Sequence, residues 1–309
     1  MQDSTGTSAT PSLQDYLQLH FLVIIWGFTA ILGRLITIPA VELVVYRTLL
    51  ASILLGLICF YKKKELNVGT SITIQFLLTG GIIALHWILF FAAARVANVS
   101  VCLAGMATGS LWTSLLEPLV QRRKVRLLEI GLGIIAIAGL YVVFRFEFTH
   151  ALGLGMAVIS AMLAALFSVI NSRFAHTYDA QVVTFYEMMG ACLSASVLLP
   201  LFSVLFYKGE PINLVPVAWD WLWIVLLAWV CTVYAYSMGV SLLRKFTPFA
   251  INLTINLEPV YGIILAVLIF GEKERMTPGF YAGTAIILLA VLIYPLLKSF
   301  QAKNIRQNV

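Results

Sequence analysis

Charged residues are scarce in this chain of 309 residues: Asp, Glu, Lys and Arg together make up 11% of it, and hydrophobic residues make up 61%. Soluble domains carry about 25% charged and about 45–50% apolar residues. The mean hydropathy of +0.96 points the same way. This composition excludes a soluble enzyme, a disordered chain and a collagen-like fibre, and it predicts a protein that crosses the membrane several times.

Cysteines and long basic runs are also scarce. All four cysteines (Cys59, Cys102, Cys192 and Cys231) fall inside apolar segments, and none belongs to a CxxC or Cys/His pattern. Neither a disulfide framework nor a metal site is therefore indicated, and we expect no cofactor. The net charge of +6 resides in short clusters such as Lys62–Lys64, which flank apolar stretches. That distribution is typical of cytoplasmic loops and not of nucleic-acid binding.

Long apolar stretches fill the chain between these clusters. A helix needs about 20 apolar residues to cross the bilayer, whereas a barrel strand would alternate in polarity over about 10 residues. We therefore expect an all-α integral membrane protein. Its ten predicted transmembrane helices span residues 17–37, 41–61, 71–94, 96–116, 127–144, 151–170, 182–207, 219–243, 246–270 and 278–297.

The distribution of Lys and Arg predicts the orientation. Most of the 20 basic residues fall on one side of the membrane if both termini are cytoplasmic, in agreement with the positive-inside rule. Residues 1–16 and 298–309 are then cytoplasmic tails. The connections between helices are short and leave no room for a soluble domain, which indicates the plasma membrane of a bacterium, the inner membrane.

A weak internal repeat relates the two halves. Ala40, Tyr46 and Ala51 match Ala180, Tyr186 and Ala191 at a separation of 140 residues, and Arg95 matches Arg244 at 149. We therefore expect a first repeat over residues 17–144 and a second over residues 151–297. Because each half has an odd number of helices, the second must be inverted relative to the first. Inverted repeats are typical of secondary transporters, with the substrate site near the midplane.

The ninth predicted helix contains Glu258 and Pro259 near its middle and ends in a Gly271-Glu272 turn, and the last helix contains Gly283. This pattern resembles the ten-helix EamA-type carriers of the drug/metabolite transporter superfamily. The resemblance implies two inverted five-helix repeats, with Pro259, Gly271, Glu272 and Gly283 as structural positions. It also implies the export of small metabolites such as amino acids.

The first repeat departs from this pattern. It carries Gln-Arg-Arg-Lys at 121–124 in place of the Gly-Glu turn. Glu117 also precedes a proline, but it comes 22 residues after Arg95, whereas Glu258 comes 14 residues after Arg244. Glu117 is therefore expected near the cytoplasmic end of its helix, and repeat symmetry assigns it no role.

Four ionisable residues lie within predicted spans, namely Arg47, His86, Glu187 and Glu258. A charge there costs about 2.5–3.5 kcal/mol on insertion and marks a function or a pair. With a rise of about 1.5 Å per residue, Arg47, His86 and Glu258 could share one level in the outer half of the membrane. Glu187, the repeat counterpart of Arg47, is expected about 12 Å from the inner edge.

Each of these residues has a functional and a structural interpretation. Glu258, beside a helix-breaking proline, could bind a proton or a substrate amine, or could be a structural partner. For Arg47 we favour an ion pair with Glu258 over binding of a substrate carboxylate. For His86 we favour hydrogen-bonded packing over a proton relay. Glu187 is expected to face a water-filled vestibule.

Polar and aromatic residues in the eighth and ninth spans complete the candidate site. Asn252 and Asn256 lie one turn apart, and they either line the cavity or bond neighbouring helices. Tyr234, Tyr236 and Trp229 either line an aromatic pocket or pack in the core, and we favour the core.

Taken with the resemblance, these features favour a secondary transporter that exports small polar or amphipathic metabolites by alternating access, with or without proton coupling. An uncoupled facilitator or channel is one alternative. A nucleotide-sugar or sugar-phosphate translocator is another, although only Arg47 and His86 would supply positive charge. An enzyme is not expected, because no paired catalytic groups share a depth. The expected partners are a small-molecule substrate and the lipid bilayer, not nucleic acid, with the protein a monomer or a homodimer.

Overall fold

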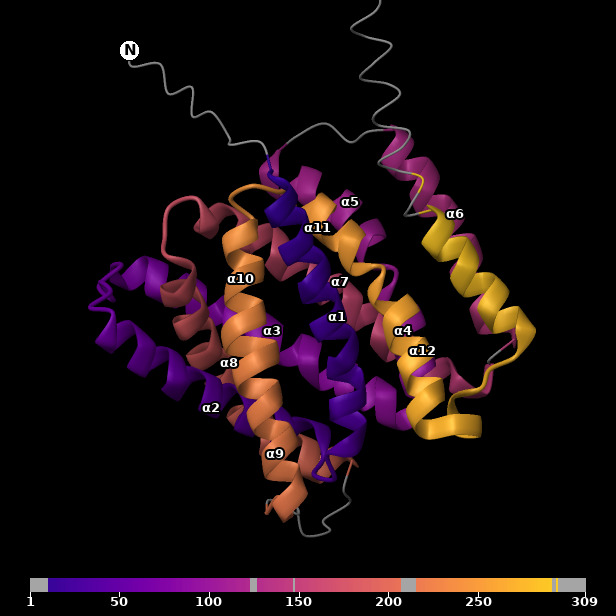
Figure 1. Ribbon diagram of the computed structural model, residues 1–309, viewed down its shortest axis with the longest axis horizontal. Helices are drawn as coiled ribbons and strands as arrows, with labels where there is room; N and C mark the ends of the chain where they lie inside the picture. Colours follow the sequence, from indigo (N-terminus) through magenta and orange to yellow (C-terminus); the bar gives the residue numbers. More distant parts are fainter. Residues whose placement is uncertain (1–10, 123–126, 147, 207–214, 291–292, 294–309) are drawn as a thin grey trace, which may run out of the picture.

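The computed structural model describes the chain except for residues 1–10, 123–126, 147, 207–214, 291–292 and 294–309. The described part is helical, with short connections (Figure 1). Its helices are α1 (Leu13–Leu35), α2 (Ala40–Tyr61), α3 (Thr70–Val96), α4 (Val99–Met106), α5 (Gly109–Gln121), α6 (Leu127–Phe146), α7 (Ala151–Ala175), α8 (Ala180–Phe206), α9 (Ala218–Leu226), the π-helical segment η2 (Leu227–Tyr234), α10 (Ala235–Leu242), α11 (Pro248–Ile255) and α12 (Glu258–Phe270). The 3-10 turns η1 (Phe148–His150) and η3 (Gly271–Glu274) and a last helix, Pro278–Ala290, complete them.

Eight stretches of the described chain are helical, long and apolar enough to cross a membrane. Four of them combine consecutive elements: α4 with α5, η1 with α7, α9 with η2 and α10, and α11 with α12 and η3. Shorter apolar helices, Gly131–Val143 within α6 and Pro278–Ala290, occupy the predicted fifth and tenth spans. The prediction of an all-α membrane protein is confirmed, whereas the described helices meet the length criterion for eight spans and not for ten.

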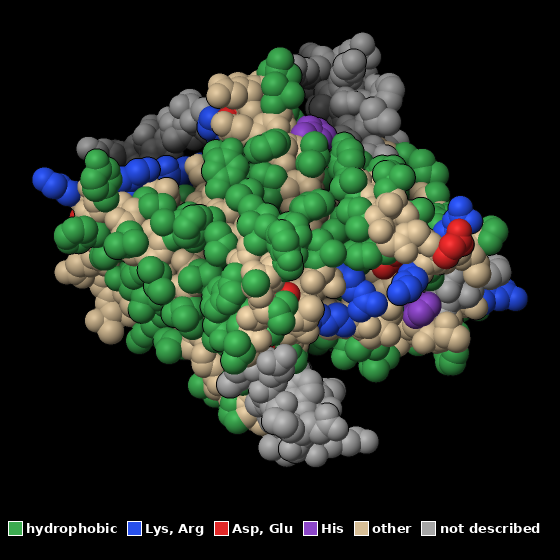
Figure 2. All heavy atoms as spheres, turned by 60° about the horizontal axis from the view of Figure 1, so that its bottom comes forward, with side chains coloured by type: hydrophobic (Ala, Val, Ile, Leu, Met, Phe, Trp, Pro, Cys, Tyr) green, Lys and Arg blue, Asp and Glu red, His purple; other side chains and the backbone are tan. Residues whose placement is uncertain are grey.

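The outer surface of the bundle is apolar. Leu119, Val197 and Leu268 are 73%, 75% and 75% exposed, and many other large hydrophobic side chains are exposed as well. Figure 2 shows such side chains over most of one face, with Lys and Arg in a few groups. Soluble monomers rarely expose apolar patches of this extent, so these side chains are suited to contact lipid.

The two halves of the chain pack closely where α3 meets α8. A Cβ atom added to Gly80 would lie 2.2 Å from the backbone oxygen of Glu187, and one added to Gly190 would lie 2.2 Å from that of Leu77. Only glycine permits this approach of the two backbones. The tight contact fixes α8 against α3 and holds Glu187 inside the protein.

The fourth and ninth predicted spans are both broken near their middle. The α4 helix ends at its C-cap Ala107 and α11 ends at its C-cap Asn256, after which α5 and α12 begin. These two breaks are 149 residues apart, the separation of Arg95 and Arg244. The prediction that residues 96–116 and 246–270 each form one continuous helix is therefore wrong. In the ninth span Pro259 lacks an N–H group, so a helix running through it would lose a backbone hydrogen bond there.

The repeat-related arginines make the same contact in each half. Arg95 donates from Nη2 to the backbone oxygen of Gly33 (3.2 Å), at the C-terminal end of α1. Arg244 donates from Nη2 to the backbone oxygen of Tyr178 (2.7 Å), just after α7. A cation at a helix C-terminus satisfies carbonyls that lack intrahelical partners. The weak sequence match between the halves thus corresponds to an equivalent structural role.

Two buried glutamates cap helices of the opposite half. Glu274, in η3, accepts hydrogen bonds from the backbone N–H groups of Val99 (3.1 Å) and Ser100 (2.9 Å) at the start of α4. Glu117, in α5, accepts one from the backbone N–H of Phe249 (3.2 Å) near the start of α11. Carboxylates satisfy the free N–H groups of a helix N-terminus and suit its dipole. The structural counterpart of Glu117 is therefore Glu274 and not Glu258.

The Glu274 cap makes a testable contribution to stability. We expect Glu274→Gln to lower the free energy of unfolding by about 1–3 kcal/mol, because an amide accepts through one oxygen only and leaves a buried N–H group without a partner. Thermal unfolding in detergent measures the change. Glu272→Gln in the same turn is the matched control, since its side chain is 78% exposed and forms an ion pair with the exposed Arg275. Equal melting temperatures for the two variants would contradict this account of the cap.

Candidate functional site

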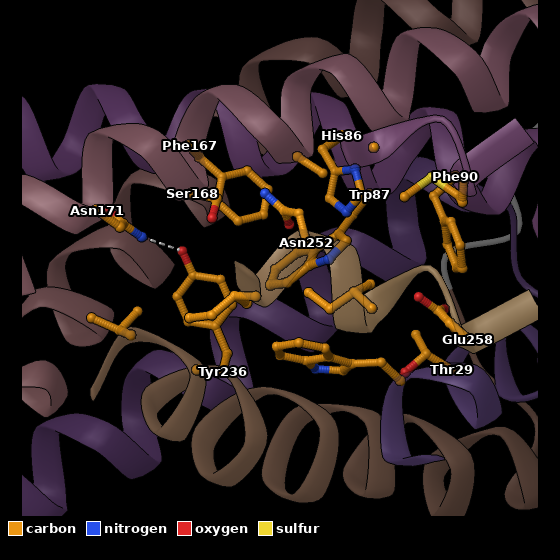
Figure 3. Close-up of a pocket in the computed structure, with 18 of the residues that line it drawn as sticks. Thr29, His86, Trp87, Phe90, Phe167, Ser168, Asn171, Tyr236, Asn252 and Glu258 are labelled. Atoms are coloured by element: carbon orange, nitrogen blue, oxygen red, sulfur yellow. Dashed lines mark hydrogen bonds between the residues drawn. The ribbon is translucent and has the colours of Figure 1, made fainter. Parts of the chain in front are cut away.

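A cavity of about 120 Å³ lies where the two broken spans meet α1, α2, α3, α7 and α10 (Figure 3). A single buried water needs about 10–15 Å³, so the cavity has room for a small solute. Six of the lining residues were selected from the sequence: Arg47, His86, Tyr236, Asn252, Asn256 and Glu258. Aromatic rings of Trp26, Trp87, Phe90 and Phe167 also line it.

The break in the ninth span places Glu258 at this cavity. Glu258 is the first residue of α12, directly before Pro259, and it is 6% exposed. It packs closely on α1, where a Cβ atom added to Gly27 would lie 3.6 Å from the Glu258 Cγ. Its carboxylate makes no hydrogen bond or ion pair with any residue that the structure describes, and Figure 3 shows it at one end of the cavity. The carboxylate is thus available to a ligand.

Arg47 lies buried in the same cavity but not in an ion pair. Its Nε donates to the Thr232 Oγ1 (2.7 Å), and its guanidinium stacks on the Trp87 ring at 3.8 Å from the centroid. Its Nη1 has no hydrogen-bond partner in the described part of the chain. The expected ion pair with Glu258 is therefore wrong, because a hydroxyl and an aromatic face hold the guanidinium instead.

A local distortion of the eighth span positions the partner of Arg47. Residues 227–234 form the π-helical segment η2, in which the Thr232 hydroxyl donates to the backbone oxygen of Leu227, five residues earlier (2.9 Å). The same hydroxyl oxygen accepts from Arg47. Short π-helical segments occur often at functional sites, and this one has no obvious signal in an apolar sequence.

His86 is held by one residue of α7. Its Nδ1 lies 2.9 Å from the backbone oxygen of Ser160, and that oxygen can only accept, so Nδ1 carries the hydrogen. The Ser160 hydroxyl lies 2.8 Å from the same nitrogen and donates to the backbone oxygen of His86 (2.9 Å). Nε2 is then the acceptor nitrogen of the ring. These bonds provide the packing role expected of His86, at the cavity wall.

The two asparagines of the ninth span both line the cavity and bond a neighbouring helix, the two roles that the sequence left open. Asn252 donates from Nδ2 to the Thr113 Oγ1 (2.8 Å), and Asn256 donates to the Ser110 Oγ (2.7 Å). Both also line the cavity. They therefore join the two broken spans, α11 to α5, and supply polar groups to the cavity.

Tyr234 and Tyr236 lie in different environments. Tyr236 is 6% exposed and lines the cavity, whereas Tyr234 is 46% exposed and contacts Phe21 edge-on at 6.4 Å between ring centroids. Trp229 is likewise exposed, at 48%. The expectation of a pocket or core position for Tyr234 and Trp229 is wrong, because both side chains point outward from the bundle.

Glu187 is fully buried, so the expectation of a water-facing vestibule residue is also wrong. It lies behind the cavity wall, where its Oε2 accepts from the Tyr236 hydroxyl (3.1 Å), which in turn accepts from the Asn171 Nδ2 (2.8 Å). Sequence reasoning missed Asn171, although an amide in an otherwise apolar span is itself a signal.

The residues taken from the family pattern have structural positions. Pro259 is buried at the start of α12, and Gly271 ends that helix with φ +63°, a conformation that favours glycine. Glu272 lies exposed in the turn. A Cβ atom on Gly283 would lie 2.8 Å from the backbone oxygen of Gly139, so the last helix packs directly on α6 at one edge of the bundle (Figure 1).

No three His, Cys, Asp or Glu side chains of the described residues gather in a way suited to hold a metal ion. The chemistry of the cavity therefore rests on one guanidinium, one carboxylate, one imidazole and several neutral polar groups among aromatic rings. Opposite charges that are not paired with each other can each bind one charged group of a solute.

Comparison with known proteins places this arrangement among transporters. The chain is 20% identical over 299 residues to a Bacillus subtilis (strain 168) protein named uncharacterized transporter YxxF, covering 94% of this chain and 91% of the relative. A solved crystal structure shares the fold with a TM-score of 0.64 and 19% identity, over 92% of this chain and 98% of the other. The EamA-like transporter family matches residues 16–145 and 151–294. Since this match covers both halves of the chain, the protein belongs to the EamA-like transporter family.

Proposed function

We propose that this transporter exports small zwitterionic metabolites, such as amino acids, across a bacterial inner membrane by alternating access of two inverted five-helix repeats. The observation that carries the proposal is the pair of opposite charges in one cavity. Arg47 and Glu258 both line it, and neither forms an ion pair with a described residue. In the orientation that the positive-inside rule favours, both termini are cytoplasmic.

The two charges suit the two ends of an amino acid. The guanidinium presents a planar fork to a carboxylate, and its Nη1 has no other partner in the described structure. The Glu258 carboxylate can accept hydrogen bonds from an ammonium group. The substrate side chain would then lie against the aromatic rings of Trp26, Trp87 and Phe167.

Desolvation explains why a zwitterion fits better than an ion of one charge. A buried charge without a counterion is costly, and breaking a buried pair by removing one partner costs about 3–5 kcal/mol. A zwitterion neutralises Arg47 and Glu258 together, whereas an amine or an acid leaves one of them without a counterion. The cavity of about 120 Å³ also has room for a small solute of this kind.

Glu258 further links the substrate to protons. Its carboxylate can bind either a proton or the ammonium group of a substrate, but not both. A carrier that exposes such a group to each side in turn exchanges protons for substrate. This competition supports proton-coupled export, and it makes acidification on the side of substrate entry inhibitory.

Counterflow in proteoliposomes tests the proposal. Vesicles are preloaded with a panel of amino acids and small amines, and entry of labelled substrate is followed with and without a pH gradient. We expect exchange of amino acids that the gradient accelerates. Exchange that ignores the gradient would indicate a facilitator, and exchange of sugar phosphates or nucleotide sugars in place of amino acids would contradict the proposed substrate class.

A further inference from the structure

A second buried carboxylate lies one side chain behind the cavity wall. Glu187 of α8 is 0% exposed and does not line the cavity, but Tyr236 and Asn171, which do, connect it to the interior space. The Tyr236 hydroxyl donates to the Glu187 Oε2 (3.1 Å) and accepts from the Asn171 Nδ2 (2.8 Å). In Figure 3 Tyr236 and Asn171 lie at the opposite end of the cavity from Glu258.

This cluster has more acceptors than donors. The Glu187 Oε1 and the Asn171 Oδ1 are both buried and have no hydrogen-bond partner in the described structure. An ionised carboxylate can only accept, so it cannot satisfy a second acceptor. A proton on Glu187 removes a buried charge and adds a hydrogen-bond donor to the cluster. The arrangement of the cluster therefore favours a protonated Glu187.

No basic group offsets the charge of Glu187. Among the described residues, the one titratable group that contacts it is Tyr236 of α10, and α7 contributes the neutral Asn171. The basic residue in the middle of α2, Arg47, bonds Thr232 and lies on Trp87, and His86 of α3 bonds Ser160. In the described part of the chain, no Lys, Arg or His contacts Glu187.

We propose that Glu187, held by Tyr236 and Asn171, is a second proton-binding site of the transport cycle, separate from the substrate-binding carboxylate. The proton comes from a hydronium ion in the water of the cavity. The Tyr236 hydroxyl gives its hydrogen to the Glu187 Oε2 and receives one from the hydronium ion, which becomes water. The carboxylate is then a neutral acid and the phenol is unchanged. The part played in transport rests on the proposed function, whereas the proton site does not.

A contiguous set of contacts relates this site to substrate binding. The Tyr236 ring contacts Trp87 edge-on at 6.2 Å between centroids and Phe167 at 5.9 Å. Trp87 is the ring on which the Arg47 guanidinium lies. When Glu187 is neutral, the Tyr236 hydroxyl no longer bonds an anion, so the charge of Glu187 affects the Arg47 site through Tyr236 and Trp87. Glu187 thus acts as a positioning residue for Arg47.

Infrared difference spectroscopy of the purified protein, recorded between acid and alkaline pH without substrate, tests the proton site directly. We expect one component of the protonated-carboxyl band to be absent in Glu187→Gln, shifted in Glu187→Asp and retained in Glu258→Gln. Tyr236→Phe should shift the same component, because the hydroxyl bond to Oε2 is lost. A Glu187→Gln spectrum identical to the native one would overturn the proposal. If that variant does not fold, an unshifted band in Tyr236→Phe and Glu187→Asp would overturn it.

The transport readout separates the two carboxylates. With the membrane potential clamped, the substrate ratio that a pH gradient sustains increases with the number of protons exchanged per substrate. We expect a smaller ratio in Glu187→Gln, whereas the main effect of Glu258→Gln is a loss of substrate affinity. An unchanged ratio in Glu187→Gln would overturn the proton assignment. So would a sodium gradient that accelerates exchange in the native protein at fixed pH but not in Glu187→Gln. Failure of amino acids to exchange in the native protein would contradict the proposed function and leave the infrared result standing.

Discussion

Replacement of Arg47 by lysine is expected to lower the affinity for an amino acid by about ten- to a hundredfold. Lysine keeps the positive charge but loses the planar fork, the stacking on Trp87 and the Nε bond to Thr232. Hydrogen bonds to charged groups contribute about 1.5–3 kcal/mol each. One lost bond of that kind to the substrate carboxylate accounts for the expected change.

The concentration dependence of counterflow measures this effect, with thermal unfolding in detergent as the check on folding. Arg34→Lys is the matched control, because Arg34 is exposed near the end of α1 and does not line the cavity. We expect native affinity in the control. Native affinity in Arg47→Lys as well would mean that Arg47 does not bind the substrate carboxylate.

Replacement of Glu258 by glutamine is expected to change the selectivity of the carrier as well as its affinity. Glutamine has nearly the same volume but cannot neutralise an ammonium group, so the affinity for a zwitterion falls by about ten- to a hundredfold. Arg47 still binds a carboxylate. The preference for an amino acid over the same acid without its amino group should therefore disappear, together with inhibition by acid.

Competition of labelled amino acid with the two unlabelled compounds, at several pH values, measures this selectivity. Glu272→Gln is the control, since that side chain is exposed in the turn after α12. Retention of the native preference and of the native pH dependence in Glu258→Gln would show that Glu258 is a structural residue.

Much of the fold follows from the apolar pattern. The predicted second and third spans, 41–61 and 71–94, match α2 (Ala40–Tyr61) and α3 (Thr70–Val96) within a few residues. The positions of charged residues within the spans also led to Arg47 and Glu258, which the structure brings to one cavity. Both successes have the same cause, because a charge in the hydrocarbon is costly and therefore conspicuous.

The rotation of each helix about its axis could not be predicted. A helix that is apolar all round does not distinguish the side that faces lipid from the side that faces protein. Tyr234 and Tyr236 differ by about 200° around a helix, at about 3.6 residues per turn, so only one of them could line the pocket. The structure places Tyr236 inward and Tyr234 outward. The same ambiguity made Glu187 seem exposed to water.

The positions of helix breaks and helix caps also could not be predicted from the sequence pattern. Pro259 indicates a discontinuity in the ninth span, but the fourth span breaks at Ala107 without a proline nearby. In the turn after α12 the family pattern drew attention to Glu272, whereas the buried cap is Glu274. Its partners at the start of α4 lie far away in the sequence, so only the folded structure reveals the contact.

The most direct test of the central claim compares three related solutes in counterflow with the native protein. One is an amino acid, the second is the amine that lacks its carboxylate, and the third is the acid that lacks its amino group. If Arg47 and Glu258 bind the two ends of one substrate, only the zwitterion exchanges at an appreciable rate. Exchange of the amine or the acid at the rate of the amino acid would contradict the account.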